Sequence, residues 1–141
     1  MTTAYDPGNV FGKILRGELP AYKVYEDAHT LAFMDVMPQG RGHALVIPKT
    51  PSRNLLDADP AVLGPLYATV QRVAKAAVAA FGADGAVVTQ FNEAEAGQTV
   101  FHLHVHVVPR FSGVSLRPHG SRKAEADELA ADAEILRAAL A

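Results

Sequence analysis

The sequence has no cysteine and no tryptophan, and its charge is nearly balanced. Without cysteine the chain can form neither a disulfide framework nor a thiolate metal site. Its 13 basic and 15 acidic residues give a formal net charge of −2, which argues against a general polyanion-binding surface. No apolar run approaches the roughly 18 residues of a membrane span, and residues 1–8 lack the pattern of a secretory signal. We therefore expect a cytoplasmic protein with no nucleic-acid and no membrane partner.

The composition that remains is typical of a globular protein. The chain has 141 residues, of which 49% are hydrophobic and 20% are charged. This length suits a single domain with one sizeable core, and the composition is not that of a disordered chain.

The most distinctive stretch is residues 99–109, TVFHLHVHVVP, in which His102, His104 and His106 alternate with apolar residues. Its β-branched and aromatic content predicts a strand, in which successive side chains point to opposite faces. We therefore expect the three imidazoles on one face and the apolar residues between them on the other.

Three interpretations of these imidazoles are open. A merely solvated strand face is disfavoured, because three of the six histidines of the chain fall within this one short run. A metal site is limited by geometry, since α-carbons at i and i+4 of a strand lie roughly 13 Å apart. The third interpretation is a central nucleophile flanked by helpers, which suits phosphorus chemistry. A neutral imidazole is a competent nucleophile at pH 7, and protonated neighbours would stabilise phosphoryl oxygens.

Patterns elsewhere predict alternating helices and strands. Asp59 and Pro60 are typical of a helix start, and the apolar spacing continues to Phe81 before Gly82. Shorter helices are expected over residues 10–16 and 121–141, and strands over residues 24–25, 31–34, 44–47 and 86–91. Residues 110–120 either lie over the substrate or form an ordinary linker.

These residues together resemble the histidine triad (HIT) family. The triad resembles the signature His-x-His-x-His, and residues 11–20 (FGKILRGELP), 31–39 (LAFMDVMPQ) and 43–49 (HALVIPK) resemble the other family landmarks in the same order. The resemblance implies an α+β fold with a mainly antiparallel five-stranded sheet, one long central helix and short N- and C-terminal helices. Residues 1–110 would form the HIT domain, and residues 111–141 a tail and helix packed on the same domain.

The resemblance also implies catalytic roles for four histidines. His104 would attack the α-phosphorus of a nucleotide, and His106 would hold the non-bridging oxygens. His102 would orient His104 through its backbone carbonyl and link to His43. His106 stands where the nucleotidyltransferase branch carries glutamine, which favours hydrolysis over transfer.

Further residues would bind the nucleotide by the same resemblance. Asp35 would accept the ribose hydroxyls beside Val36, as suits a carboxylate that accepts two hydrogen bonds. The remaining expected binding residues, at the base pocket or near the phosphate, are Phe11, Ile14, Phe33, Asn92, Gly97, Gln98 and Thr99. A plain hairpin loop would explain Asn92 and Gly97 equally well.

The implied activity is hydrolysis at the α-phosphate of a nucleoside 5′-phosphoramidate or related adenylate, through a covalent nucleotidyl-histidine. A purine nucleotide substrate, no cofactor and a homodimer are expected. Two alternatives stay open: a dinucleoside polyphosphate hydrolase, which residues 95–100 and 108–110 resemble, and a non-catalytic nucleotide-binding dimer that acts through partners.

The zinc site that many bacterial relatives carry has lost its ligands here. At three of its four matching positions the chain has Asn9, Gly12 and Pro51, which leaves only His102. One ligand cannot make a tetrahedral site, so we predict that the protein holds no metal there.

Overall fold

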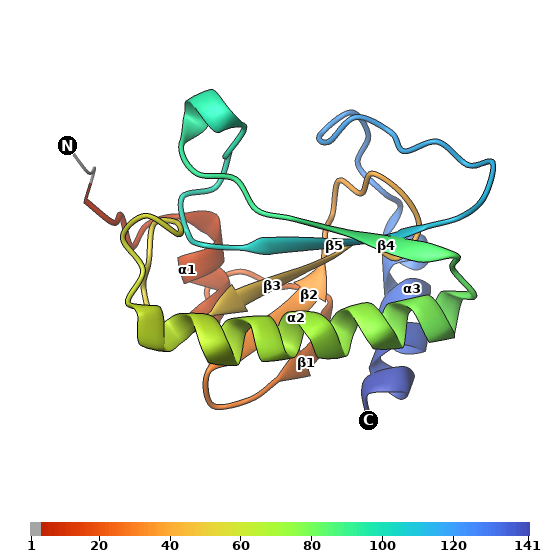
Figure 1. Cartoon of the computed structure of the whole chain (residues 1–141), viewed down its shortest axis with the longest axis horizontal. Helices are drawn as coiled ribbons and strands as arrows, with labels where there is room; N and C mark the ends of the chain where they lie inside the picture. The colour runs from red at the N-terminus through yellow and green to blue at the C-terminus, as the bar shows by residue number, and fades with distance from the viewer. Residues whose placement is uncertain (1–3) are drawn as a thin grey trace.

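The structure, a computed structural model, describes residues 4–141, so residues 1–3 of the expected domain lie outside it. Five antiparallel strands form one sheet in the order β1-β2-β3-β5-β4, and a long helix runs along it (Figure 1). The elements in chain order are α1 (Val10–Leu15), β1 (Lys23–Glu26), β2 (Thr30–Met34), β3 (Ala44–Pro48), α2 (Pro60–Phe81), β4 (Gly85–Thr89), the 3₁₀ helix η1 (Ala94–Ala96), β5 (Val105–Arg110) and α3 (Ala126–Leu140). This confirms the predicted α+β fold.

Helix α2 has the start and stop that its sequence predicts. The Asp59 carboxylate accepts a hydrogen bond from the Ala61 amide, and Pro60 occupies the first turn, where a missing amide hydrogen costs nothing. The helix ends at Gly82, whose φ of 64° lies in the left-handed region that glycine tolerates. The side chains that it buries against the sheet recur every three or four residues and are Leu66, Thr69, Val70, Val73, Ala77 and Phe81.

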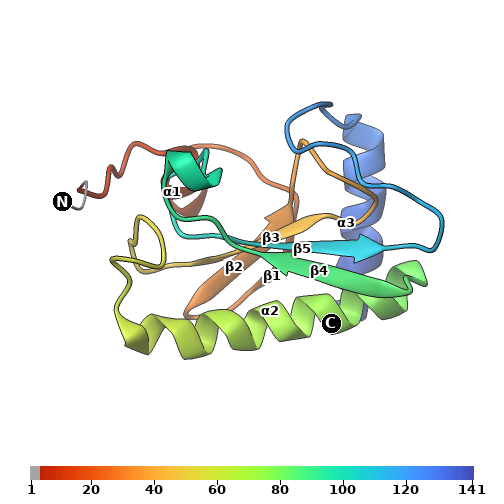
Figure 2. The ribbon, with the colours of Figure 1, turned by 45° about the horizontal axis from the view of Figure 1, so that its top comes forward.

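The two faces of the sheet carry separate clusters of apolar side chains. Alternation along β3 sends Ala44 and Val46 toward the helices α2 and α3, and Leu45 and Ile47 to the opposite face. Helix α1 covers that second face and lies on the other side of the sheet from α2 in Figure 2. The side chains of the candidate site described below belong to the face that α1 covers.

The C-terminal part of the chain returns to the same sheet. Helix α3 packs against α2 and β1 and buries the four residues that its periodicity predicts, Leu129, Ala133, Leu136 and Leu140. It begins at Ala126, later than the expected limit of 121. Residues 111–125, called the strap below, lie against the loop after β2: the Arg117 amide donates to the Gln39 carbonyl (2.8 Å), and the Ala124 amide to the Val36 carbonyl (2.9 Å). None of the helices formed by residues 4–141 combines the length and hydrophobicity that a membrane crossing needs.

Strand β5 is shorter than the sequence predicts, because it begins only at Val105. His102 and His104 therefore lie just before the strand. The ladder between β3 and β5 ends with Val46 opposite Val105. Pro48, at the end of β3, has no amide hydrogen with which to extend it, and its carbonyl instead accepts a hydrogen bond from the His102 ring.

Candidate active site

The register of the central strands places His106 on the α1 side of the sheet. Phe33 on β2 pairs with Leu45 on β3, and Leu45 pairs with His106 on β5, so the three side chains lie side by side on one face. Val105 and Val107 point into the core on the other face. The predicted alternation is confirmed for this part of the histidine stretch. His104 lies next to His106, with ring centroids 5.0 Å apart.

His104 is held in one tautomer by its own backbone neighbour. Its Nδ1 lies 2.7 Å from the His102 carbonyl oxygen, the contact that the sequence analysis predicts. A carbonyl can only accept, so Nδ1 carries the hydrogen and the lone pair of a neutral ring is on Nε2. The Phe11 ring packs edge to face with the His104 ring, with the two ring centroids 5.0 Å apart. His104 thus has the tautomer that a nucleophile needs.

His102 is fully buried and both of its ring nitrogens are paired. Nε2 lies 2.8 Å from the Pro48 carbonyl oxygen and therefore donates. Nδ1 lies 2.7 Å from the Tyr5 hydroxyl and therefore accepts. The predicted link between His102 and His43 is wrong, because Tyr5 and Pro48 take every hydrogen-bonding position of this ring.

His43 contacts His106 instead. The Gln39 amide donates to His43 Nδ1 at 3.0 Å, so the hydrogen of the neutral His43 ring is on Nε2. That Nε2 lies 3.0 Å from Nδ1 of His106. His106 therefore accepts at Nδ1 and carries its own hydrogen on Nε2. A chain of three groups thus makes His106 a donor at Nε2 while its ring stays uncharged.

Burial keeps these histidines neutral. Loss of hydration lowers the pKa of His43 and of His102 to about 4 and that of His106 to about 3. Burial also lowers the pKa of His104. The expectation that protonated neighbours stabilise phosphoryl oxygens is therefore wrong for His102 and His106 at pH 7. His106 is thus a neutral donor at Nε2.

Asp35 is a buried carboxylate at the edge of the same group. Its Oδ1 accepts from the Met37 amide at 2.8 Å, and its Oδ2 lies 3.0 Å from Nε2 of His119 and 3.4 Å from Nε2 of His43. Burial alone would raise the pKa of Asp35. The nearby His43, the Met37 amide and His119 oppose burial and hold that pKa below its usual value, so the carboxylate is ionised at pH 7.

A cavity of about 530 Å³, a size that suits a small-molecule ligand, adjoins His104 and His106. Its apolar wall includes four residues that the sequence analysis assigns to nucleotide binding, together with Leu45: Phe11, Ile14, Phe33 and Val36. The polar and charged residues that line it are Asp35, Thr99, His104, His106, His119 and Lys123. His43 and His102 are fully buried behind this lining.

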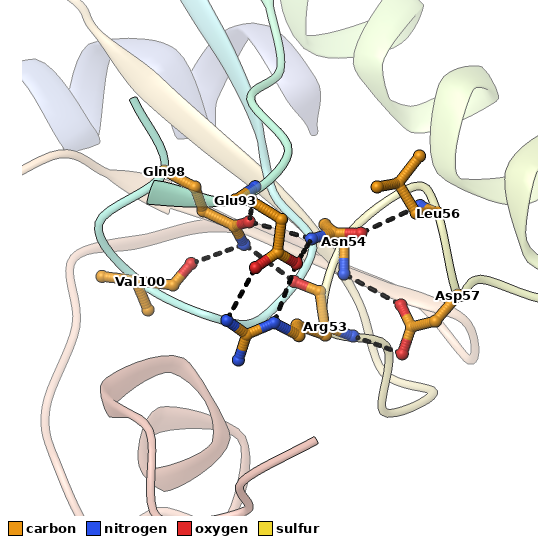
Figure 3. A network of polar contacts seen from close by, with 7 residues as sticks. All are labelled: Arg53, Asn54, Leu56, Asp57, Glu93, Gln98 and Val100. Atoms are coloured by element: carbon orange, nitrogen blue, oxygen red, sulfur yellow. Dashed lines mark hydrogen bonds and ion pairs between the residues drawn. The ribbon is translucent and has the colours of Figure 1, made fainter. Parts of the chain in front are cut away.

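Gln98 does not line this cavity, although the resemblance assigns it to the phosphate. Figure 3 shows its amide inside a polar network between two loops. Oε1 accepts from the Asn54 side chain (3.1 Å) and the Glu93 amide (2.8 Å), while Nε2 donates to the carbonyls of Arg53 (2.8 Å) and Val100 (3.0 Å). All four hydrogen-bonding positions are used, so the arrangement gives Gln98 a structural task.

Asn92 and Gly97 also lie outside the cavity lining. The Asn92 side chain accepts a hydrogen bond from the Leu55 amide at 2.9 Å and pairs with Gln90. Gly97 has a φ of 105°, which requires glycine where the loop leaves η1. The loop explanation left open in the sequence analysis therefore accounts for both residues.

Sequence reasoning missed two residues that contact the histidine group. Tyr5 precedes α1, and nothing in its local pattern indicates the contact with His102. His119 comes from the strap, and its ring centroid lies 5.2 Å from that of His106 and 5.9 Å from that of His43. Long-range contacts of single residues in irregular chain leave no periodic signal. The proposal that residues 110–120 lie over the substrate is the nearest hint in the sequence.

A five-stranded antiparallel sheet backed by a long helix, with three alternating histidines beside a ligand-sized cavity, defines a histidine-triad protein. The HIT domain family matches residues 16–113, and the chain belongs to this family. It is thereby placed in a superfamily of nucleotide-binding proteins and hydrolases.

Relatives match between 78% and 97% of the chain. A Hit-like protein from Bartonella henselae, described as involved in cell-cycle regulation, has a crystal structure with a TM-score of 0.91 and 51% identity, covering 97% of this chain and 100% of that one. An uncharacterised HIT-like protein of Mycobacterium tuberculosis is 41% identical over 94% of this chain and 92% of its own length. The adenylylsulfatase HINT3 of Arabidopsis thaliana is 39% identical over 78% of this chain and 59% of its own length.

One structural relative, a zinc-bound histidine triad protein from Mycobacterium smegmatis, has a TM-score of 0.84 and 40% identity over 94% of this chain and 93% of that one. Potential ligand atoms of Asp35, His43 and His106 lie within 4.8 Å of one another here. However, His43 accepts the Gln39 amide at Nδ1, so its neutral ring has no lone pair at Nε2 for a cation. His102 uses both ring nitrogens as well. Neither place fits a divalent metal.

Proposed function

We propose that the protein hydrolyses the bond between the α-phosphorus and the leaving group of nucleoside 5′-phosphoramidates or related adenylates, with His104 as the nucleophile. The hydrogen bond from His104 Nδ1 to the His102 carbonyl is the observation that carries this proposal, because it leaves the Nε2 lone pair for attack. His104 also lines the cavity, so a bound phosphate can reach it.

The cavity supports a nucleotide in a defined orientation. Its apolar wall, with Phe11, Ile14 and Phe33, offers a surface for a purine base. Asp35 is the carboxylate that can accept ribose hydroxyls. The base and ribose bound in this way would bring the 5′-phosphate toward the histidines, as a cavity with an apolar end and a polar end requires.

The chemistry divides into two displacements. His104 Nε2 forms a bond to the α-phosphorus as the bond to the leaving group breaks, and a leaving amine takes up a proton from solvent water. The His102 carbonyl stabilises the positive charge that develops on the His104 ring, and the Nε2–H of His106 donates to a non-bridging oxygen. Water then cleaves the nitrogen–phosphorus bond, releases the nucleoside monophosphate and restores His104.

The cavity favours a small leaving group over a polyphosphate. Among the residues that line it within the described chain, Lys123 is the one lysine, and there is no arginine. A polyphosphate chain would find few cationic partners there. The Arabidopsis relative is named an adenylylsulfatase, which agrees with a small leaving group on an adenylate.

We also propose a homodimer. Strand β4 is at the edge of the sheet and pairs with β5 alone, and the Val88 and Phe91 side chains near that edge are exposed. An apolar strand edge of this kind favours pairing with a second copy. A cytoplasmic location stays a prediction from the sequence.

The test is to trap the covalent intermediate. Protein incubated with adenosine 5′-phosphoramidate, adenylylsulfate or a diadenosine polyphosphate is quenched in denaturant at neutral pH, and its mass is measured. We expect a nucleotidyl adduct and turnover with the first two substrates, with neither in His104→Ala. The exposed-turn variant His29→Ala is the matched control and keeps both.

Two results would contradict the proposal. Equal hydrolysis by the His104→Ala variant would show that the nucleophile is misassigned. Tight binding of AMP with no turnover of any substrate would favour the non-catalytic nucleotide-binding dimer instead.

A further inference from the structure

The strap places His119 next to the Asp35 carboxylate of the cavity, although the two residues are far apart in the sequence. His119 Nε2 lies 3.0 Å from Oδ2 of Asp35, and the His119 ring lines the cavity beside His106. The side chain is 37% exposed, so it is open to a bound ligand while the Asp35 carboxylate is nearly covered. Neither the triad nor its tautomers require this contact.

The Asp35 carboxylate keeps free acceptor positions for hydrogen bonds while it is bonded to His119. A carboxylate has about four acceptor positions. The Met37 amide takes one on Oδ1 and His119 takes one on Oδ2. The hydrogen of His43 Nε2 is used by His106, so the 3.4 Å approach of His43 to Oδ2 adds no full bond. One acceptor position therefore remains on each oxygen while His119 stays in place.

Two acceptor positions on one fixed carboxylate match a pair of adjacent hydroxyls. The Met37 amide and His119 hold the two oxygens from different elements, so the carboxylate plane cannot rotate freely. A fixed plane loses less entropy on binding than a mobile one. The arrangement suits a cis-diol that donates one hydrogen bond to each oxygen.

We propose that His119 is a positioning residue that makes the nucleotide site specific for ribose. It acts through Asp35, which it holds in the orientation that accepts both the 2′- and the 3′-hydroxyl. The inference rests on the proposed function for nucleotide binding and extends it to the sugar, and it assigns part of the specificity to the strap.

The strap does not depend on this contact for its own position. The backbone hydrogen bonds from Arg117 to Gln39 and from Ala124 to Val36 hold it on either side of His119. Replacing the His119 ring therefore changes the surroundings of Asp35 without releasing the strap, which makes a substitution at this position informative.

The experiment measures the affinity of wild type, His119→Ala, His119→Gln and His29→Ala for AMP and for 2′,3′-dideoxy-AMP by calorimetry. Wild type and His29→Ala should prefer AMP. His119→Ala should lose about tenfold in that preference, because AMP binds more weakly and the dideoxy nucleotide does not. His119→Gln, which keeps an N–H donor, should recover most of it. With adenosine 5′-phosphoramidate, the KM of His119→Ala should rise by a larger factor than its kcat falls, since His119 acts on the binding of the sugar.

Each other outcome overturns the inference in a recognisable way. An unchanged preference in His119→Ala means that His119 has no part in ribose recognition. A greater preference means that His119 competes with the sugar for Asp35. If wild type binds AMP and the dideoxy nucleotide equally, Asp35 does not bind the ribose hydroxyls. If wild type binds neither, the proposed function itself fails.

Discussion

His43 and His106 share one hydrogen, with Nε2 of the first 3.0 Å from Nδ1 of the second. The Gln39 amide donates to His43 Nδ1, which places the hydrogen of the neutral His43 ring on Nε2. His106 therefore accepts at Nδ1 and carries its own hydrogen on Nε2. We expect His43→Leu to lower kcat/KM by about ten- to a hundredfold, because His106 is then free to adopt the tautomer without a hydrogen on Nε2. Steady-state kinetics with a phosphoramidate substrate measure the loss.

The matched variant is His43→Gln, which keeps an N–H donor at the end of its side chain. It should retain more activity than His43→Leu at comparable stability. Equal activity in the two variants would show that the hydrogen bond to His106 is not what His43 contributes.

The neutral histidines predict that the protein loses stability below pH 6.5. The folded pKa values of about 4 for His43 and His102 and about 3 for His106 lie below the ordinary value of 6.5. The unfolded chain therefore binds more protons as pH falls, and the stabilisation present above pH 6.5 is lost toward pH 4. Each such histidine lowers the free energy of unfolding by up to about 1.4 kcal/mol per pH unit in this window.

Urea unfolding at pH 7.5, 6 and 5 measures this slope. His43→Leu should show a smaller slope than wild type, and His29→Ala, which changes an exposed residue, should show the same slope. A free energy of unfolding that is constant from pH 7.5 to 5 would contradict the assignment of neutral rings.

Gln98 should prove to be a structural residue. Gln98→Leu leaves the Glu93 amide and one of the two N–H groups of the Asn54 side chain without an acceptor in a buried network (Figure 3), at a cost of about 2–4 kcal/mol in the free energy of unfolding. The affinity of the folded variant for AMP should not change. Gln71→Leu, on the exposed side of α2, is the control for the substitution itself. A loss of AMP affinity at unchanged stability would instead support the contact between Gln98 and the phosphate that the family resemblance implies.

Protein purified without added metal should contain no stoichiometric zinc. The Tyr5 hydroxyl and the Pro48 carbonyl use both ring nitrogens of His102, and the positions at which the family resemblance implies the other zinc ligands carry Asn9, Gly12 and Pro51. Elemental analysis of the purified protein checks this. One zinc per chain would overturn the prediction.

The proposed homodimer is tested at the edge of β4. Val88→Lys places a charge on an exposed apolar position of that edge and should shift the protein to monomer in analytical ultracentrifugation. Ile135→Lys, a similarly exposed position on α3, should leave the assembly unchanged. A wild-type monomer at micromolar concentration would refute the proposal directly.

The sequence was most informative where a pattern repeats. The limits of α2 and the buried face of α3 follow from caps and apolar spacing, and the position of His106 follows from alternation along a strand. The predicted start of β5 was too early. The pairing of β5 with β3 stops near Pro48, which has no amide hydrogen, and the residues of β5 themselves give no sign of a proline on the neighbouring strand. Gln98, Tyr5 and His119 have partners more than 40 residues away in the chain, and no local pattern contains that information. The expected protonation of the neighbours of His104 was also wrong, since the burial that keeps His102 and His106 neutral depends on the packed structure.

The strap forms one wall of the cavity from residues that follow the part of the chain matched by the HIT family, which ends at residue 113. Two proteins with identical histidines could therefore select different sugars, because the discriminating side chain would lie in an appended segment. Assigning substrates to relatives by their shared domain alone would miss this difference, and an alignment extended through the last 30 residues or so would be needed to sort them.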